Sequence, residues 1–333
     1  MELFYKSQIS LARSTEGQMW LISFCVFLAV IQSALTDSFS SLIIAVSAVS
    51  VAALTEFFIY FRTDRAGIVH DGSSVLSPLI LTLLLPNHLN PVYAAVGAFF
   101  AMAVVKHSFG GPGSNWLNPA VGAWLFIRFS WPDAFNKALE LASIPQESAP
   151  ASALAERIAD FLNQTIFPFI GTSIPSWYID LFNAQQAGII ADRGIAALLV
   201  GTIIMSAFGT SRIWIPVVYL AVYCLLIRVF GAFFNGGLLG QGDMMQGLFS
   251  GATLVAAFLL IADPATKAKS SVGVLVTTIL AAILAFIFRY CAGDLYGAVS
   301  SVALINIVSL AVRDIENKSL HESISLLKSY DDH

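Results

Sequence analysis

Ten stretches of mostly apolar residues, each 15 to 23 residues long, alternate with polar connections along the chain. A helix that crosses a bilayer needs about 20 such residues, and fewer where its ends are broken or re-entrant. The pattern therefore predicts ten membrane spans. They lie at residues 19–35, 39–61, 72–86, 91–106, 117–131, 188–208, 213–230, 246–262, 271–290 and 295–312.

The third and eighth spans resemble each other. The third opens with Asp71-Gly72 and the eighth with Gly242-Asp243, and a proline follows each apolar run. Because the two are five spans apart, they enter the membrane from opposite sides, which is typical of inverted repeats. We expect an all-α polytopic membrane protein built from two inverted five-helix repeats. The expected parts are a first repeat at 1–131, an extracytoplasmic loop at 132–187, a second repeat at 188–312 and a cytoplasmic tail at 313–333.

Composition supports a membrane protein and the charges orient it. Hydrophobic residues make up 57% of the chain and charged residues 11%, whereas soluble domains average about 25% charged. If the N-terminus is cytoplasmic, the cytoplasmic segments hold eleven of the 17 Lys and Arg residues, as the positive-inside rule requires. These are Lys6, Arg13, Arg62, Arg65, Lys106, Arg212, Lys267, Lys269, Arg313, Lys318 and Lys328. We expect a bacterial inner-membrane protein with both termini in the cytoplasm and no nucleic-acid partner.

The long connection at 131–187 carries the whole formal charge of -4. It holds six acidic and two basic residues, while the remainder of the chain holds 15 of each. Its middle, about 148–163, is expected to form a surface helix. The segment is interpreted as a folded acidic cap or docking surface, and the alternative is a mobile loop.

Ionisable residues are scarce inside the spans. Glu56 lies about one turn from the cytoplasmic end of the second span, and a titratable group at that depth is a candidate for an ion path. It could pair with Arg62 or reach water, so a simple interfacial ion pair is the alternative. The three cysteines lie far apart in apolar stretches and predict no metal site.

Residues 106–120 form an irregular, glycine-rich segment, Lys-His-Ser-Phe-Gly-Gly-Pro-Gly-Ser-Asn-Trp-Leu-Asn-Pro-Ala. It resembles a segment of the family that contains the D-type component of the Rnf electron-transport complex and the B-type component of the sodium-pumping NADH:quinone reductase. Other segments match in the same order. They are Asp71-Gly72-Ser73, Trp214-Ile215-Pro216-Val217, Leu248 to Leu254, Ala262 to Thr266, and Gly297-Ala298-Val299. The absence of a longer N-terminal region favours the Rnf branch.

The resemblance implies a membrane subunit of a redox-driven Na⁺ or H⁺ pump, with Rnf subunits of the A, B, C, E and G types and membrane lipid as partners. Alone it would not be a complete enzyme, and no catalytic residue is assigned. Its implied cofactors are FMN, held through a threonine phosphoester, and riboflavin. By resemblance the residues near a flavin or ion site are Asp71, Asp243, Lys106, Gly110, Gly111 and Asn118.

The flavin-attachment pattern itself is altered. The long loop lacks the family's G-A-T sequence, and its nearest counterparts are Thr172 and Ser173. An S-G-A-T sequence ends instead at Thr253, within the eighth span, where a small-residue helix-packing patch is the preferred interpretation. The alternatives left open for the flavin are an anchor at any of these three residues or no covalent flavin at all. For the function they are a cofactor-poor structural subunit or a solute channel of inverted-repeat fold.

Overall fold

The computed structural model describes residues 15–36, 39–63, 71–108, 115–143, 153–165, 188–210 and 212–331. Within these ranges the regular structure is helical, apart from one isolated bridge between Pro86 and Ile189. Five helical segments are long and apolar enough to cross a membrane. They are α1 (Thr15–Thr36), α2 (Ser40–Thr63), α11 (Trp214–Leu226) with the π-helical turn η4 (Ile227–Gly231), α14 (Ser271–Phe286) with η7 (Ile287–Cys291), and the first part of α15 (Gly297–Asp331). The protein is therefore a helical membrane protein.

The other segments predicted as spans are also helical, but they are short or interrupted. These are α3 (Ser73–Leu84), α4 (Pro91–Phe100) with η2 (Ala101–Lys106), α5 (Pro119–Ser130), α9 (Ile190–Arg193) with α10 (Ile195–Ala207), and α12 (Met244–Leu248) with α13 (Thr253–Val255) and η6 (Ala256–Leu260). A short 3-10 turn, η5 (Phe233–Asn235), precedes α12. The structure thus bears out an all-helical membrane protein and leaves the number of spans a prediction.

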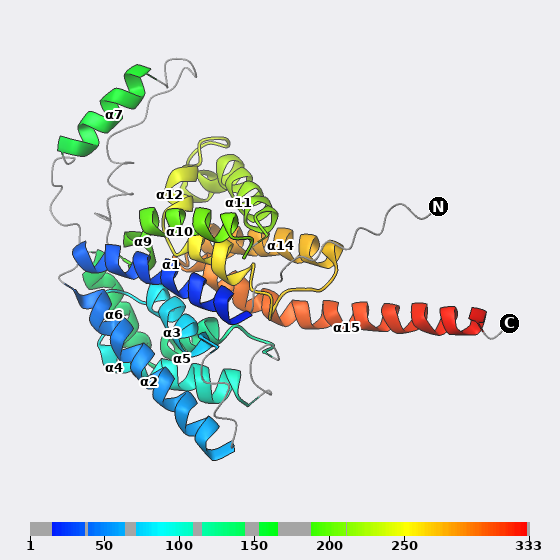
Figure 1. Ribbon diagram of the computed structural model, residues 1–333. Helices are drawn as coiled ribbons and strands as arrows, with labels where there is room; N and C mark the ends of the chain where they lie inside the picture. The colour runs from blue at the N-terminus through cyan, green and yellow to red at the C-terminus, as the bar shows by residue number, and fades with distance from the viewer. Residues whose placement is uncertain are drawn as a thin grey trace.

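Helices α1 and α10 pack side by side, so the N-terminal helices contact the helices that follow residue 188 (Figure 1). Two glycines allow their close approach. A Cβ atom on Gly194 would lie 2.6 Å from the Ala29 carbonyl oxygen, and one on Gly201 would lie 2.9 Å from Cys25 Cβ. Small residues let helix backbones approach closely in membranes, where apolar burial alone gives little driving force for helix association.

The outward surface of the long helices is apolar. Phe57, Phe58 and Phe61 on α2 are each more than half exposed, as are Val272 and Val276 on α14. The opposite faces pack small and aliphatic side chains into one continuous core. An apolar outside around an apolar core is the arrangement that a lipid environment stabilises.

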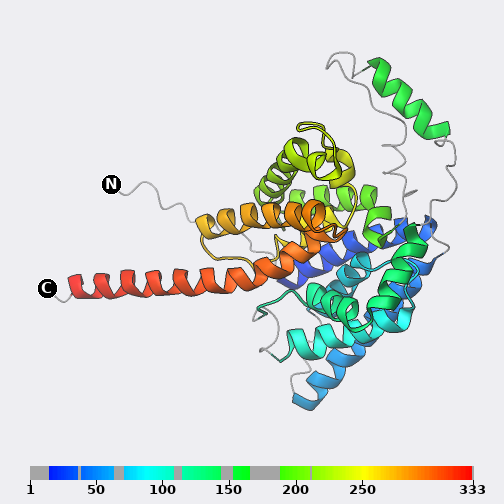
Figure 2. The same cartoon turned by 180° about the vertical axis from the view of Figure 1, so that it is seen from behind.

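The ends of two predicted segments differ in detail, and one helix was not predicted. Helix α7 (Ala153–Thr165) covers most of the predicted surface helix, and a further helix, α6 (Pro132–Ser143), buries Phe135 in the core. Residue 312 is not a helix end, because α15 continues to Asp331 and extends beyond the other helices (Figure 2).

Candidate functional site

A buried charged cluster lies where α3 begins. The Lys106 ammonium donates hydrogen bonds to Glu56 Oε1 on α2 and to Ser73 Oγ on α3. Both charged side chains are shielded from solvent, at 2% exposure for Lys106 and 0% for Glu56. Ser73 in turn donates its backbone N–H to Asp71 Oδ1 at 2.9 Å, and its hydroxyl donates to the same oxygen. We refer to Glu56, Asp71, Ser73 and Lys106 as the Lys106 cluster.

Local backbone geometry brings the cluster together. Lys106 is the last residue of the π-helical segment η2, which continues α4. A π-helix has more residues per turn than an α-helix, so the Lys106 side chain points in a different direction from the one a continuous α-helix would give it. Gly72, just before α3, has a left-handed φ of +78°, and a Cβ there would lie 3.2 Å from the Trp20 indole nitrogen. Glycine is therefore needed at the turn that places Ser73 and Asp71 beside the lysine.

The structure corrects the expected partner of Glu56. We expected Arg62 or water, but Glu56 is fully buried and pairs with Lys106, whereas Arg62 lies on the exposed end of α2. His107 is the next closest basic group, with Nε2 3.7 Å from Glu56 Oε1, and its ring stands edge-on to Tyr60. Glu56 faces the helix bundle, and this orientation cannot be read from a uniformly apolar helix.

A second group of charged residues stabilises the turn between α12 and α13. Gly251 and Ala252 have left-handed φ values of +71° and +56°, so the helix stops there and restarts at Thr253. The Asp192 carboxylate from α9 accepts the two free N–H groups of this turn, Gly251 N at 2.9 Å and Ala252 N at 3.0 Å. Asp192 is buried, and a carboxylate on helix N-terminal N–H groups is favoured by the helix dipole.

Arg289 braces the same break from η7. Its guanidinium donates to the Ser250 carbonyl oxygen at 3.0 Å and to Ser250 Oγ at 2.6 Å. Ser250-Gly251-Ala252, interpreted as a small-residue helix-packing patch, therefore lie in a turn between two helical pieces and not on a helix. The turn is nevertheless closely packed, because a Cβ on Gly251 would clash with the Leu295 carbonyl oxygen.

The surroundings of Thr253 do not fit a flavin phosphoester. Its side chain is 1% exposed, and its hydroxyl donates to the carbonyl oxygens of Gly247 and Ser250. The adjacent cavity has about 10 Å³, which is room for about one water molecule. Asp243 instead caps α12, accepting from Met245 N and Gln246 N.

Helix α5 is tied at both ends to the second part of the chain. At its start, Asn118 Nδ2 donates to Asp263 Oδ2 at 2.9 Å while Asn118 Oδ1 caps the helix. At its end, Arg128 forms a two-pronged ion pair with Asp294 at 3.0 and 3.2 Å and lies over the Trp124 ring. Two-pronged Arg–carboxylate pairs fix geometry as well as adding stability.

The structure brings together some of the residues singled out in the sequence. Glu56, Asp71 and Lys106 meet in one cluster, whereas Asn118 pairs with Asp263 and Asp243 caps a helix. Gly110, Gly111, Thr172 and Ser173 lie outside the described residues. The described residues contain no group of three or more His, Cys, Asp or Glu side chains suited to a metal ion.

The roles of Asp192, Arg289 and Arg128 were not foreseen. Asp192 stands where the resembled family often has glutamate, but this position gave no indication of its partners. Arg128 and Arg289 stand near the ends of the fifth and ninth predicted spans, which likewise gave no indication of their protein partners. Their partners are distant in sequence, so only the fold reveals them.

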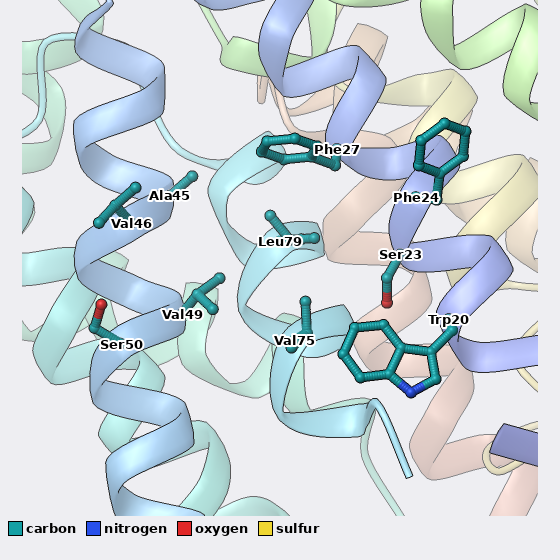
Figure 3. A pocket seen from close by; sticks show the side chains of 10 residues that line it. All are labelled: Trp20, Ser23, Phe24, Phe27, Ala45, Val46, Val49, Ser50, Val75 and Leu79. Carbon is teal, nitrogen blue, oxygen red and sulfur yellow. The ribbon is translucent and has the colours of Figure 1, made fainter. Parts of the chain in front are cut away.

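An apolar groove opens between α1 and α2, with α3 as its floor (Figure 3). Its volume is about 370 Å³. Trp20, Phe24 and Phe27 line the α1 side, and Val75 and Leu79 rise from α3. No charged side chain is among the ten residues drawn, so this groove differs in kind from the Lys106 cluster.

Comparison with known proteins gives consistent similarities. Residues 4–320 match the sequence model of the NQR2, RnfD, RnfE family. The chain is 25% identical to the D component of the proton-translocating ferredoxin:NAD(+) oxidoreductase complex of Clostridium ljungdahlii, over 87% of each chain. It is 29% identical to the D component of the Na(+)-translocating ferredoxin:NAD(+) oxidoreductase complex of Acetobacterium woodii, over 80% of this chain and 78% of that one. It is 28% identical to the D component of the ion-translocating oxidoreductase complex of Shewanella sediminis, over 86% and 87%.

Proposed function

The chain belongs to the NQR2, RnfD, RnfE family, and we propose that it is the D-type membrane component of a complex that couples electron transfer between ferredoxin and NAD to Na⁺ or H⁺ translocation. The observation that carries the proposal is a family match over nearly the whole chain, together with relatives that share one component name over most of their length. The other Rnf subunits and the surrounding lipid are its partners.

The test of this function uses the assembled complex. Inside-out vesicles from the native host should couple ferredoxin-dependent NAD⁺ reduction to ion uptake, and deletion of this chain should abolish both. Restoring the chain should restore both. Coupled activity that persists without the chain would refute the assignment. Solute flux through the purified chain in liposomes would favour a channel instead.

We place Glu56 on the ion path. It is a fully buried carboxylate within α2, and intramembrane ionisable groups are costly and usually functional. Asp71, which is half-buried, connects it to the α3 end through Ser73 and Lys106. Two of the similar proteins named above belong to complexes that move different ions, so similarity alone does not choose between Na⁺ and H⁺.

We also propose ten spans in two inverted halves, and matching contacts at the start of α3 and of α13 support this. Lys106 in η2 donates to Ser73 at the start of α3, and Arg289 in η7 donates to Ser250 beside α13. In each half a basic residue in a π-helical turn therefore donates a hydrogen bond to a serine at, or just before, the start of a helix. A left-handed glycine, Gly72 or Gly251, stands next to each serine. Inverted repeats with broken helices near a functional site are common in transporters.

The proposed inner-membrane orientation predicts cysteine accessibility. In a variant without Cys25, Cys224 and Cys291, Ser148→Cys should react with a membrane-impermeant maleimide added outside, because 132–187 is extracytoplasmic. Lys269→Cys should react only after permeabilisation. Lys269 is exposed, and its replacement leaves the Ser270 cap of α14 intact. The reverse labelling pattern would refute the orientation.

For the cofactor we propose FMN on the extracytoplasmic loop, anchored at Thr172 or Ser173, with riboflavin as a second, non-covalent flavin. Coexpressed with a flavin transferase, the denatured wild-type chain should fluoresce in a gel, and Thr172→Ala or Ser173→Ala should abolish the signal. Thr253→Ala is the matched control and should keep it, because the Thr253 hydroxyl is buried. Fluorescence lost only in Thr253→Ala would contradict the assignment, and none in wild type would favour a cofactor-poor subunit.

A further inference from the structure

The Lys106 cluster is not electrically balanced. Glu56 and Asp71 supply two negative charges and Lys106 one positive charge, so with the neighbouring His107 counted as neutral the side chains sum to a formal charge of -1. The α3 N-terminus adds a partial positive charge of roughly +0.5. About half a negative charge therefore remains around a site that is closed to solvent at Glu56.

One oxygen of Glu56 is also left over. Lys106 binds Oε1, whereas the buried Oε2 meets no donor in good hydrogen-bonding geometry within the described part of the chain. The Ser74 hydroxyl and the His107 imidazole also lie against this carboxylate and stabilise it. A buried carboxylate oxygen that is poorly hydrogen-bonded costs free energy, and carboxylate and hydroxyl oxygens are ligands of the kind that hard cations bind.

The Lys106 ammonium has a second possible position, beside Ser73 and Asp71. Lys106 already bonds Ser73 Oγ, which bonds Asp71, so a small rotation of the flexible lysine stem would carry the ammonium from Glu56 toward Asp71. Lysine suits such an exchange better than arginine, because its ammonium is a compact point charge on a long stem and not a rigid planar fork.

We propose that Lys106 is a resident counter-cation for Glu56, and that a translocated monovalent metal cation binds Glu56 by displacing the ammonium toward Ser73 and Asp71. This inference rests on the ion path proposed above. The occupied and unoccupied sites then both keep Glu56 neutralised. Because the residual charge is small, the ion binds weakly enough to leave again, as conduction requires.

The test measures how the Na⁺ concentration controls ferredoxin-dependent NAD⁺ reduction and ²²Na⁺ uptake by the complete complex in vesicles. Lys106→Gln removes the competitor and should lower the half-saturating Na⁺ concentration about tenfold or more. Lys106→Arg should raise it by a similar factor, because a two-pronged guanidinium is harder to displace. Lys137→Gln is the matched control, since Lys137 is exposed on α6, and it should change nothing.

The outcomes separate the two proposals. Glu56→Gln should abolish the Na⁺ dependence of the activity. If an assembled Glu56→Gln complex keeps that dependence, Glu56 is not on the ion path. If Glu56→Gln abolishes the dependence but Lys106→Gln leaves the half-saturating Na⁺ concentration unchanged or raises it, the ion path stands and only the displacement of Lys106 is wrong. Should Lys106→Gln fail to assemble, Lys106→Arg decides, because an unchanged or lowered value there overturns the displacement. A wild-type complex insensitive to Na⁺ would also overturn it.

Discussion

Replacing Lys106 with methionine should destabilise the protein by about 3–5 kcal/mol, whereas the double variant Glu56→Gln with Lys106→Met should recover most of that loss. The single change leaves the buried Glu56 carboxylate without its counter-charge, in a place where water cannot solvate it. The double change removes both charges and keeps similar side-chain volumes. The measurement is a double-mutant cycle on the purified chain in detergent, read as the midpoint of thermal unfolding and as the free energy of unfolding.

The shape of the cycle distinguishes a buried ion pair from simple packing. If Lys106 only fills space, the two single changes should add, and the double variant should be the least stable of the four proteins. Lys137→Met provides the comparison for loss of an exposed positive charge, and we expect it to change stability by less than about 0.5 kcal/mol. Additive single effects would show that Glu56 and Lys106 do not interact.

Helix positions could be predicted well from the sequence, because apolar runs in a membrane protein directly reflect the backbone's need to satisfy its own hydrogen bonds in lipid. Helix interruptions could be predicted less well. The turn at Gly251 and Ala252 requires a left-handed alanine, a conformation that costs about 1–2 kcal/mol and that no local sequence signal indicates. It persists because Asp192, from a distant segment, binds both N–H groups.

The site was only partly predictable for a related reason. Glu56 was identified because charge is rare inside a span, and Asp71 and Lys106 because their segments resemble a known family. The pairing of Glu56 was missed, since its direction depends on which face of α2 meets η2. Likewise the link between Asn118 and Asp263 spans 145 residues. Sequence patterns thus identified chemically important residues, and tertiary packing determined their partners.

Asp192→Asn should be the second most damaging change, with a loss of about 3 kcal/mol. Both carboxylate oxygens of Asp192 accept backbone N–H groups, and hydrogen bonds to charged groups contribute about 1.5–3 kcal/mol each. An asparagine keeps one acceptor and turns an NH₂ group toward the second N–H, so one buried donor loses its partner. Arg289 also loses a nearby negative charge. The measurement is again the thermal midpoint in detergent, together with protease accessibility between α12 and α13.

Two companion variants test whether the carboxylate acts through that turn. Asp192→Glu keeps both acceptor oxygens and should retain most of the stability. Asp243 caps the neighbouring helix α12, and asparagine is also a good capping residue, so Asp243→Asn should lower the free energy of unfolding by less than about 1 kcal/mol. If Asp192→Asn and Asp243→Asn have equal effects, the buried carboxylate is not what holds the break. If only Asp192→Asn exposes residues 249–252 to protease, Asp192 keeps α13 starting at Thr253, and the broken helix depends on one charge from a distant segment.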